Sequence, residues 1–161
     1  MINRAKIVSI RNMKKKIAII NLLLIYLFST SIIGANTSNY LEEGIKLYNK
    51  KEFEKSKIFF EKDIVYDPRS ENSYLYLAKI FNEKEDIEQE EINLNNVLLL
   101  NPDNDEAIYM LIILKLEQSD YDEAKNLLDT FLKVCNSFCT KKAEIEEKLK
   151  KLTPENANEK N

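Results

Sequence analysis

Histidine and tryptophan are absent from this 161-residue chain, and glycine (2), proline (3), methionine (3) and cysteine (2) are scarce. Without histidine, the usual proton shuttle, the commonest metal ligand and every Ser-His or Cys-His nucleophile pair are excluded. Few glycines and prolines, with abundant Leu, Ile, Lys, Glu and Asn, favour helices joined by short turns over sheets. We therefore expect one all-α body that is not an enzyme and uses no metal or cofactor.

Acidic residues are missing from the first 35 positions, which carry six basic residues. The remainder has 18 basic against 27 acidic residues, a net charge of −9. Nucleic-acid binding requires a basic face that displaces counterions from phosphates, and an acidic body does not supply one. We therefore expect no nucleic-acid partner.

Residues 17–35 are an uncharged apolar run that directly follows Lys14, Lys15 and Lys16 and ends at Ala35. This layout predicts a signal peptide over residues 1–35, with export of the rest to the periplasm or the medium. Translation would then begin naturally at Met13, just before the basic residues. The alternative is that the run is retained as a membrane anchor, because its length is close to the roughly 20 residues that span a bilayer.

A period of 34 residues runs through the rest of the chain, where Asp67-Pro68 is repeated as Asn101-Pro102. Each period divides into two halves with apolar residues at helical spacing, which predicts two antiparallel helices per repeat. Proline closes the first two repeats, because it cannot continue the preceding helix. The breaks inside the repeats are expected at Lys51-Glu52, Glu85-Asp86 and Ser119-Asp120.

Aromatic, small and closing Pro positions recur in register with this period. They are Tyr40, Gly44, Leu47, Tyr48, Phe53, Ser56, Phe60 and Pro68; Tyr74, Leu77, Ala78, Phe81, Val97 and Pro102; and Leu111, Tyr121, Ala124, Leu128 and Phe131. At these residues the chain resembles the tetratricopeptide repeat (TPR) family. The resemblance implies a short α-solenoid of three hairpins within residues 36–135, at about 37–68, 71–102 and 105–136. The sequence departs from the family pattern at Asp63, Glu90, Lys115 and Asn136.

The residues after the third repeat show a narrow apolar stripe beneath a charged face, formed by Ala143, Ile145, Leu149 and Leu152. A stack of repeats needs a terminal element that is polar outward, so we expect a capping helix within 137–152. Residues 153–161 contain Pro154 and no large apolar side chain, which predicts a disordered tail.

The resemblance also implies a concave face, lined by the first helix of each repeat, on which peptides or partner helices lie. The side chains expected there are Leu41, Ile45, Tyr48 and Asn49; Leu75, Tyr76, Lys79 and Asn82; and Tyr109, Met110, Ile113 and Leu116. Such an apolar and aromatic face predicts a groove for an apolar partner segment. The alternative is that some of these side chains are core, covered by a neighbouring helix or by the C-terminal helix.

Cys135 and Cys139 are the chain's only cysteines. In an exported protein an even, local pair fits a disulfide, provided that a turn at Asn136-Ser137 brings the two side chains together. Free structural thiols are the alternative. The spacing is not Cys-x-x-Cys, and two cysteines without histidine do not complete a zinc site.

These patterns together predict an exported scaffold that binds a partner protein in a concave apolar groove. The alternative is a single-pass, membrane-anchored accessory subunit of an envelope complex, which contacts the membrane only through residues 17–35. A hydrolase or a thiol oxidoreductase would need an activated nucleophile, and the sequence offers none.

Overall fold

The structure, a computed structural model, describes Met13 and residues 39–152. The fold described here belongs to the second of the chain's two units, Ser38–Asn161. The predicted signal peptide and C-terminal tail lie outside the described residues.

The described part of the chain is helical, and no strand occurs in it, which confirms the predicted all-α class. Its elements are α2 (Tyr40–Asn49), α3 (Phe53–Tyr66), α4 (Glu71–Glu83), α5 (Ile87–Leu100), α6 (Asp105–Glu117), α7 (Tyr121–Val134), the 3₁₀ turn η1 (Cys139–Lys141) and α8 (Lys142–Leu152).

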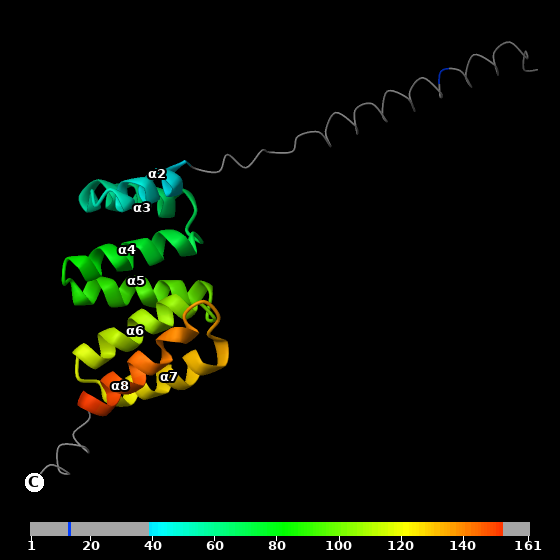
Figure 1. Ribbon diagram of the computed structural model, residues 1–161. Coiled ribbons are helices and arrows are strands. Elements are labelled where there is room, and N and C mark those ends of the chain that lie inside the picture. Colours follow the sequence, from blue (N-terminus) through cyan, green and yellow to red (C-terminus); the bar gives the residue numbers. More distant parts are fainter. Residues whose placement is uncertain (1–12, 14–38, 153–161) are drawn as a thin grey trace, which may run out of the picture. The chain divides into compact units, whose positions relative to one another are not determined.

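The helices pair into three antiparallel hairpins, α2 with α3, α4 with α5 and α6 with α7, and the hairpins stack in chain order (Figure 1). Between hairpins, α3 packs on α4 and α5 packs on α6. Each second helix ends just before an Asp-Pro or Asn-Pro pair or before Cys135. The two Pro residues stop the helix and turn the chain back, so that the next first helix lies against the preceding second helix.

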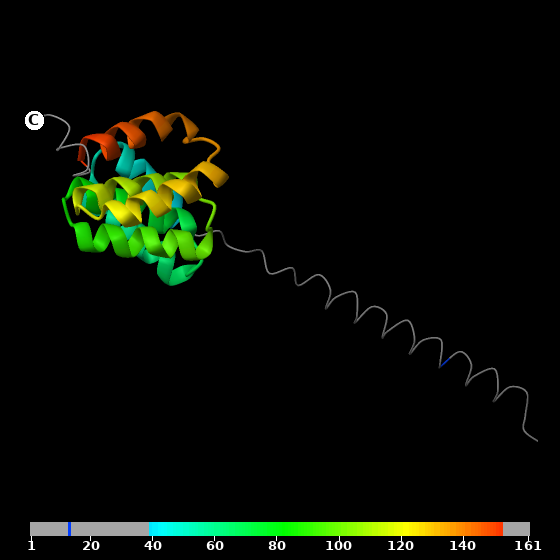
Figure 2. The ribbon, with the colours of Figure 1, turned by 90° about the horizontal axis from the view of Figure 1, so that it is seen from below.

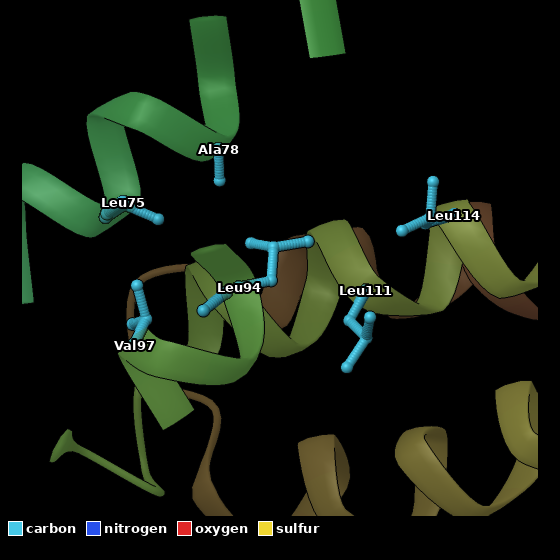
Figure 3. Packing of buried hydrophobic residues seen from close by; sticks show 7 residues of the cluster. Leu75, Ala78, Leu94, Val97, Leu111 and Leu114 are labelled. Atoms are coloured by element: carbon cyan, nitrogen blue, oxygen red, sulfur yellow. The ribbon is translucent and has the colours of Figure 1, made fainter. Parts of the chain in front are cut away.

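Three buried clusters hold the stack together. The middle cluster joins α4, α5 and α6 through Leu75, Ala78, Leu94, Val97, Ala107, Leu111 and Leu114 (Figure 3). The first is built around Phe60, Leu77, Ile80 and Phe81 and joins α3 to α4. The last joins α6, α7 and α8 through Ile108, Ile112, Leu116, Ala124, Phe131, Ile145 and Leu149. Each hairpin therefore buries its apolar faces against its neighbours, as stacked repeats do.

Gly44 allows the close approach of α2 and α3. A Cβ atom at this position would lie 2.6 Å from Cε1 of the Phe60 ring, well inside van der Waals contact. The Ser56 hydroxyl donates a hydrogen bond of 2.8 Å to the Gly44 carbonyl across the same contact. The small residue at this repeat position is thus required by packing rather than by backbone conformation.

The charged residues that depart from the repeat pattern all have polar partners. The buried Asp63 carboxylate accepts hydrogen bonds from the hydroxyls of Ser70 (2.5 Å) and Ser73 (2.7 Å), which ties the end of α3 to the start of α4. The buried Glu90 carboxylate accepts from the amide of Asn82 at 3.1 and 3.2 Å. In the described part of the chain, no buried side-chain nitrogen or oxygen is without a hydrogen-bond partner.

Candidate partner-binding face

The first helices α2, α4 and α6 present equivalent positions at 34-residue spacing along one side of the stack. Most of the side chains expected on this face are half-buried, namely Leu41, Ile45, Tyr48, Tyr76, Lys79, Tyr109, Met110 and Ile113. The apolar and aromatic ones pack on the three core clusters with one side and keep part of their surface open. The face is therefore the outer edge of the core.

The structure corrects the expectation for Leu75, which is only 5 % exposed. Its side chain lies in the middle cluster with Leu94 and Val97 of α5 (Figure 3). Leu116 is buried in the last cluster, and the Asn82 side chain bonds to Glu90. Leu75 and Leu116 are thus covered by neighbouring helices, whereas Asn82 remains exposed although its side chain bonds to Glu90.

Aromatic side chains form the centre of the face between α2 and α4. The Tyr48 ring meets Tyr76 edge-on with 5.1 Å between ring centroids, and it also lies 5.4 Å from the Phe53 ring. Tyr76 stacks on the buried Phe60 at 5.0 Å. Such aromatic pairs stabilise packing beyond their buried area, so the two tyrosines form a firm, partly open platform.

Charged groups surround this platform. The Lys79 ammonium lies 4.9 Å from the centroid of the Tyr76 ring and 2.8 Å from a carboxylate oxygen of Glu106. Burial, followed by the neighbouring Glu83, Tyr76 and Glu106, raises the pKa of the Tyr48 hydroxyl. Lys79 is already paired, and the nearby Glu83 is exposed. The platform therefore carries excess negative charge at its border.

At the third repeat the same face is covered by α8. Seen along the stack, α8 lies at the edge where α2 is visible, and α3 and α5 lie at the opposite edge (Figure 2). It packs mainly on α6 and less on α7. Ile145 and Leu149 are buried, while Ala143 and Leu152 of the expected stripe are exposed. The helix therefore docks with two apolar side chains and keeps its charged face outward.

Polar and aromatic contacts fix α8 on this face. The Tyr109 hydroxyl donates a hydrogen bond of 2.9 Å to Glu144, and the Tyr109 ring lies 5.8 Å from the ring of Phe138. The ammonium of Lys141 lies 5.3 Å from the Tyr109 ring centroid and 2.9 Å from Glu144. Burial, together with Glu144, raises the pKa of Tyr109. Tyr109 thus helps to dock α8, while its side chain stays half-buried.

The segment between α7 and α8 is held by two devices. A disulfide joins Cys135 and Cys139, with 5.1 Å between their Cα atoms. One carboxylate oxygen of Asp105 accepts hydrogen bonds from the backbone N–H groups of Asn136 (2.7 Å) and Phe138 (2.8 Å). Burial alone would raise the pKa of Asp105, but these N–H groups outweigh it and lower the pKa. Sequence analysis missed Asp105, because the donors to its carboxylate are backbone N–H groups, which no residue pattern marks.

Among residues 39–152, no group of three or more Asp, Glu or Cys side chains could hold a metal ion. Within the same residues, no helix is long and apolar enough to cross a membrane.

No protein-family model matches the sequence, and no curated protein matches it. Solved structures do match by fold. SycD, a type III secretion chaperone of Yersinia enterocolitica solved in complex with a peptide of the translocator YopD, matches with a TM-score of 0.66 and 12% identity over 76% of this chain and 96% of that one. A tetratricopeptide repeat protein of Parabacteroides merdae matches with a TM-score of 0.66 and 18% identity over 81% of this chain and 50% of that one.

The Sgt2 TPR domain of Aspergillus fumigatus matches with a TM-score of 0.62 and 15% identity, over 78% of this chain and 83% of that one. Identities this low carry the fold and nothing more. The described part of this chain is an all-α solenoid of the tetratricopeptide type.

Proposed function

We propose that the protein is an exported interaction scaffold whose first two repeats bind an amphipathic helix of a partner protein. The proposed binding face consists of the half-buried side chains of α2 and α4, centred on Tyr48 and Tyr76. The observation that carries the proposal is the docking of α8 on the third repeat, because it is a bound amphipathic helix on the equivalent surface.

The repeat register relates the covered and the open parts of this face. Tyr109 and Ile113, which pack where α8 docks, correspond to Leu41 and Ile45 two repeats earlier. All four side chains are half-buried, but α8 docks beside the later two, whereas Leu41 and Ile45 lie on α2, which packs on α3 and α4. Burying apolar surface of this kind against a partner removes it from water, which contributes favourably to the free energy of binding. A partner helix with apolar residues at i, i+3 and i+4 would match the face as α8 does.

The charge around the platform suggests what else the partner carries. Glu83 is exposed beside Tyr48, whereas Lys79 is neutralised by Glu106. A basic side chain next to the partner's apolar stripe would complement Glu83. Such charge complementarity speeds the association of the two proteins and disfavours other partners. The peptide-bound SycD structure supports a peptide-binding use of this type of fold.

Export rests on the sequence of residues 1–35, which lie outside the described residues. The disulfide supports this part of the proposal, because such bonds persist mainly in oxidising compartments. The mass of the protein recovered from cells tests it. A chain that begins near Asn36 would fit cleaved export, whereas a retained residue 17–35 segment would favour the membrane-anchored accessory subunit.

Site-specific photocrosslinking in intact cells tests the binding face. A photoreactive amino acid would replace Asn49 or Glu83, which are exposed beside the platform, and Lys125 on α7 would serve as the matched exposed control. We expect an adduct with one partner protein from the two face positions and none from the control. Equal labelling from Lys125, or no adduct from Asn49 and Glu83, would contradict the proposal. Mass spectrometry of the adduct identifies the partner segment.

A further inference from the structure

A second apolar surface lies on α3 and faces away from the core. Ile58 is 49 % exposed, Val65 85 % and Tyr66 57 %, and Tyr40 of α2 borders them at 39 %. Together with Glu61 and Lys62, these side chains line an open hollow of about 510 Å³. Exposed apolar side chains that gather around a hollow mark an interaction surface. This surface lies outside the core clusters and outside the proposed partner-binding face.

The charges at the centre of this surface distinguish α3 from the two other second helices described. Positions equivalent to Ile58 and Val65 are also apolar and exposed in α5, as Ile92 and Leu99. Between them, however, α5 carries Asn95 and Asn96, and α7 carries Asp129 and Thr130. Of these three helices, only α3 has two opposite charges, Glu61 and Lys62, at the centre of an apolar stripe.

The stripe on α3 is complementary to itself. Residues 58, 61, 62 and 65 share one face of the helix, because they are spaced by three and four positions. Ile58 and Val65 are equally far in sequence from the midpoint between Glu61 and Lys62. If a second α3 crosses the first in the antiparallel direction with a two-fold axis at this midpoint, Ile58 faces the partner copy's Val65. In the same arrangement Glu61 faces the partner copy's Lys62, and the reverse contact forms as well.

We propose that this surface is the interface of a symmetric dimer, formed by antiparallel packing of α3 against α3 of a second copy. Isologous interfaces of this kind use one patch twice and close after two subunits. A lipid surface is a poorer occupant, because it would bury the charges of Glu61 and Lys62 at the centre of the patch. The uncharged residues 17–35 would likewise bring no opposite charge to this centre.

The contacts within one copy are compatible with this arrangement. Glu61 accepts a hydrogen bond of 2.5 Å from Lys57 on its own helix, and the two side chains are 50 % and 26 % exposed. The Lys62 ammonium lies 5.4 Å from the Phe59 ring centroid. Both central charges therefore already lie along α3, so ordering them in an interface costs less side-chain entropy.

Cysteine crosslinking of the full-length chain in intact cells tests the register. Two differently tagged copies would be co-expressed, one with Ile58→Cys and the other with Val65→Cys. We expect a mixed disulfide between them and little crosslinking when either variant is expressed alone. Two copies of the same position would be separated by seven residues, about 10 Å along the helix axis. Lys125→Cys is the control outside the surface.

A charge exchange in the same assay tests the central contacts. Glu61→Lys or Lys62→Glu alone sets like charges against each other and should lower the crosslink yield about fivefold. The double variant restores opposite charges and should recover the yield to within about twofold of the parent. Failure of the double variant to recover, equal yield from the single-cysteine variants alone, or no crosslink at any pair would overturn the proposal. Protease resistance of each variant in the same cells reports that the fold is retained.

Discussion

The turns inside the three hairpins allow a quantitative test of the fold. Lys51, Glu85 and Ser119 have φ values of 60°, 56° and 62°, in the left-handed region. Each follows a first helix and closes the same hydrogen-bond pattern, as in the bonds from the N–H of Glu52 to the carbonyl of Leu47 and from Lys51 to Tyr48. This is the Schellman motif, in which glycine is the usual residue at the left-handed position.

Glycine at these positions should therefore stabilise the protein. A left-handed conformation costs a non-glycine residue roughly 1–2 kcal/mol. Glycine avoids that cost but loses about 0.5–1 kcal/mol more conformational entropy on folding. The expected net gain is about 0.5–1 kcal/mol for each of Lys51→Gly, Glu85→Gly and Ser119→Gly, and about 1.5–3 kcal/mol for the triple variant if the turns are independent. All three side chains are exposed, so little packing is lost.

Urea unfolding followed by circular dichroism at 222 nm measures the gain, and a thermal scan should show about 3–5 °C per kcal/mol. The matched controls are Lys50→Gly and Lys84→Gly, one residue earlier, where φ is −86° and −97°. Glycine has no conformational advantage at these angles, so the controls should gain nothing. Glycine variants that are no more stable than their controls would refute the reasoning.

Three further predictions concern single side chains. Gly44→Ala should destabilise the protein by about 1 kcal/mol, as measured by urea unfolding. The reason is that overpacking against the Phe60 ring costs roughly 1–3 kcal/mol, which exceeds the gain in helix propensity. This loss of stability should be smaller in a Phe60→Leu background. Burial raises the pKa of Glu90, so its stabilising contribution is present at low pH and lost as the pH rises through the folded pKa. Glu90→Gln should therefore be at least as stable as the parent at neutral pH and lose this advantage in acid. Backbone N–H groups lower the pKa of Asp105, so its contribution is present above the unfolded value of about 3.9 and lost as the pH falls through the folded value. Asp105→Asn should remove this contribution at neutral pH and should make Phe138 more accessible to proteolysis.

The hairpins could be predicted from the sequence because their signals are local. Pro68 and Pro102 end the second helices, and the 34-residue period sets the register of every apolar position. Exposure on the first helices could not be predicted in the same way. Leu75 and Leu41 share a register position, but Leu75 is covered by α5 and α6 and Leu41 is not. The difference comes from the number of neighbouring hairpins, which no single repeat encodes.

The position of α8 was also beyond the sequence pattern. Its apolar residues predict a helix that packs somewhere on the last repeat, but not on which side. The structure places it against α6 because the preceding segment is held by Asp105 through backbone N–H groups and closed by the disulfide. Such contacts depend on geometry between segments about 31 residues apart and leave no periodic signal.

The two ends of the stack differ in whether another helix covers them, and this difference favours the proposed dimer. At the C-terminal end, α8 covers the last hairpin and turns a charged face outward. At the N-terminal end, no preceding hairpin among the described residues covers α2. Tyr40 is 39 % exposed there, whereas Ile108 at the same register position is 1 % exposed. Terminal repeats need a polar outer face or a cover to remain soluble. A second copy packed on α3 would also cover Tyr40, which borders the α3 surface, so the proposed dimer would remove part of this uncovered end from water.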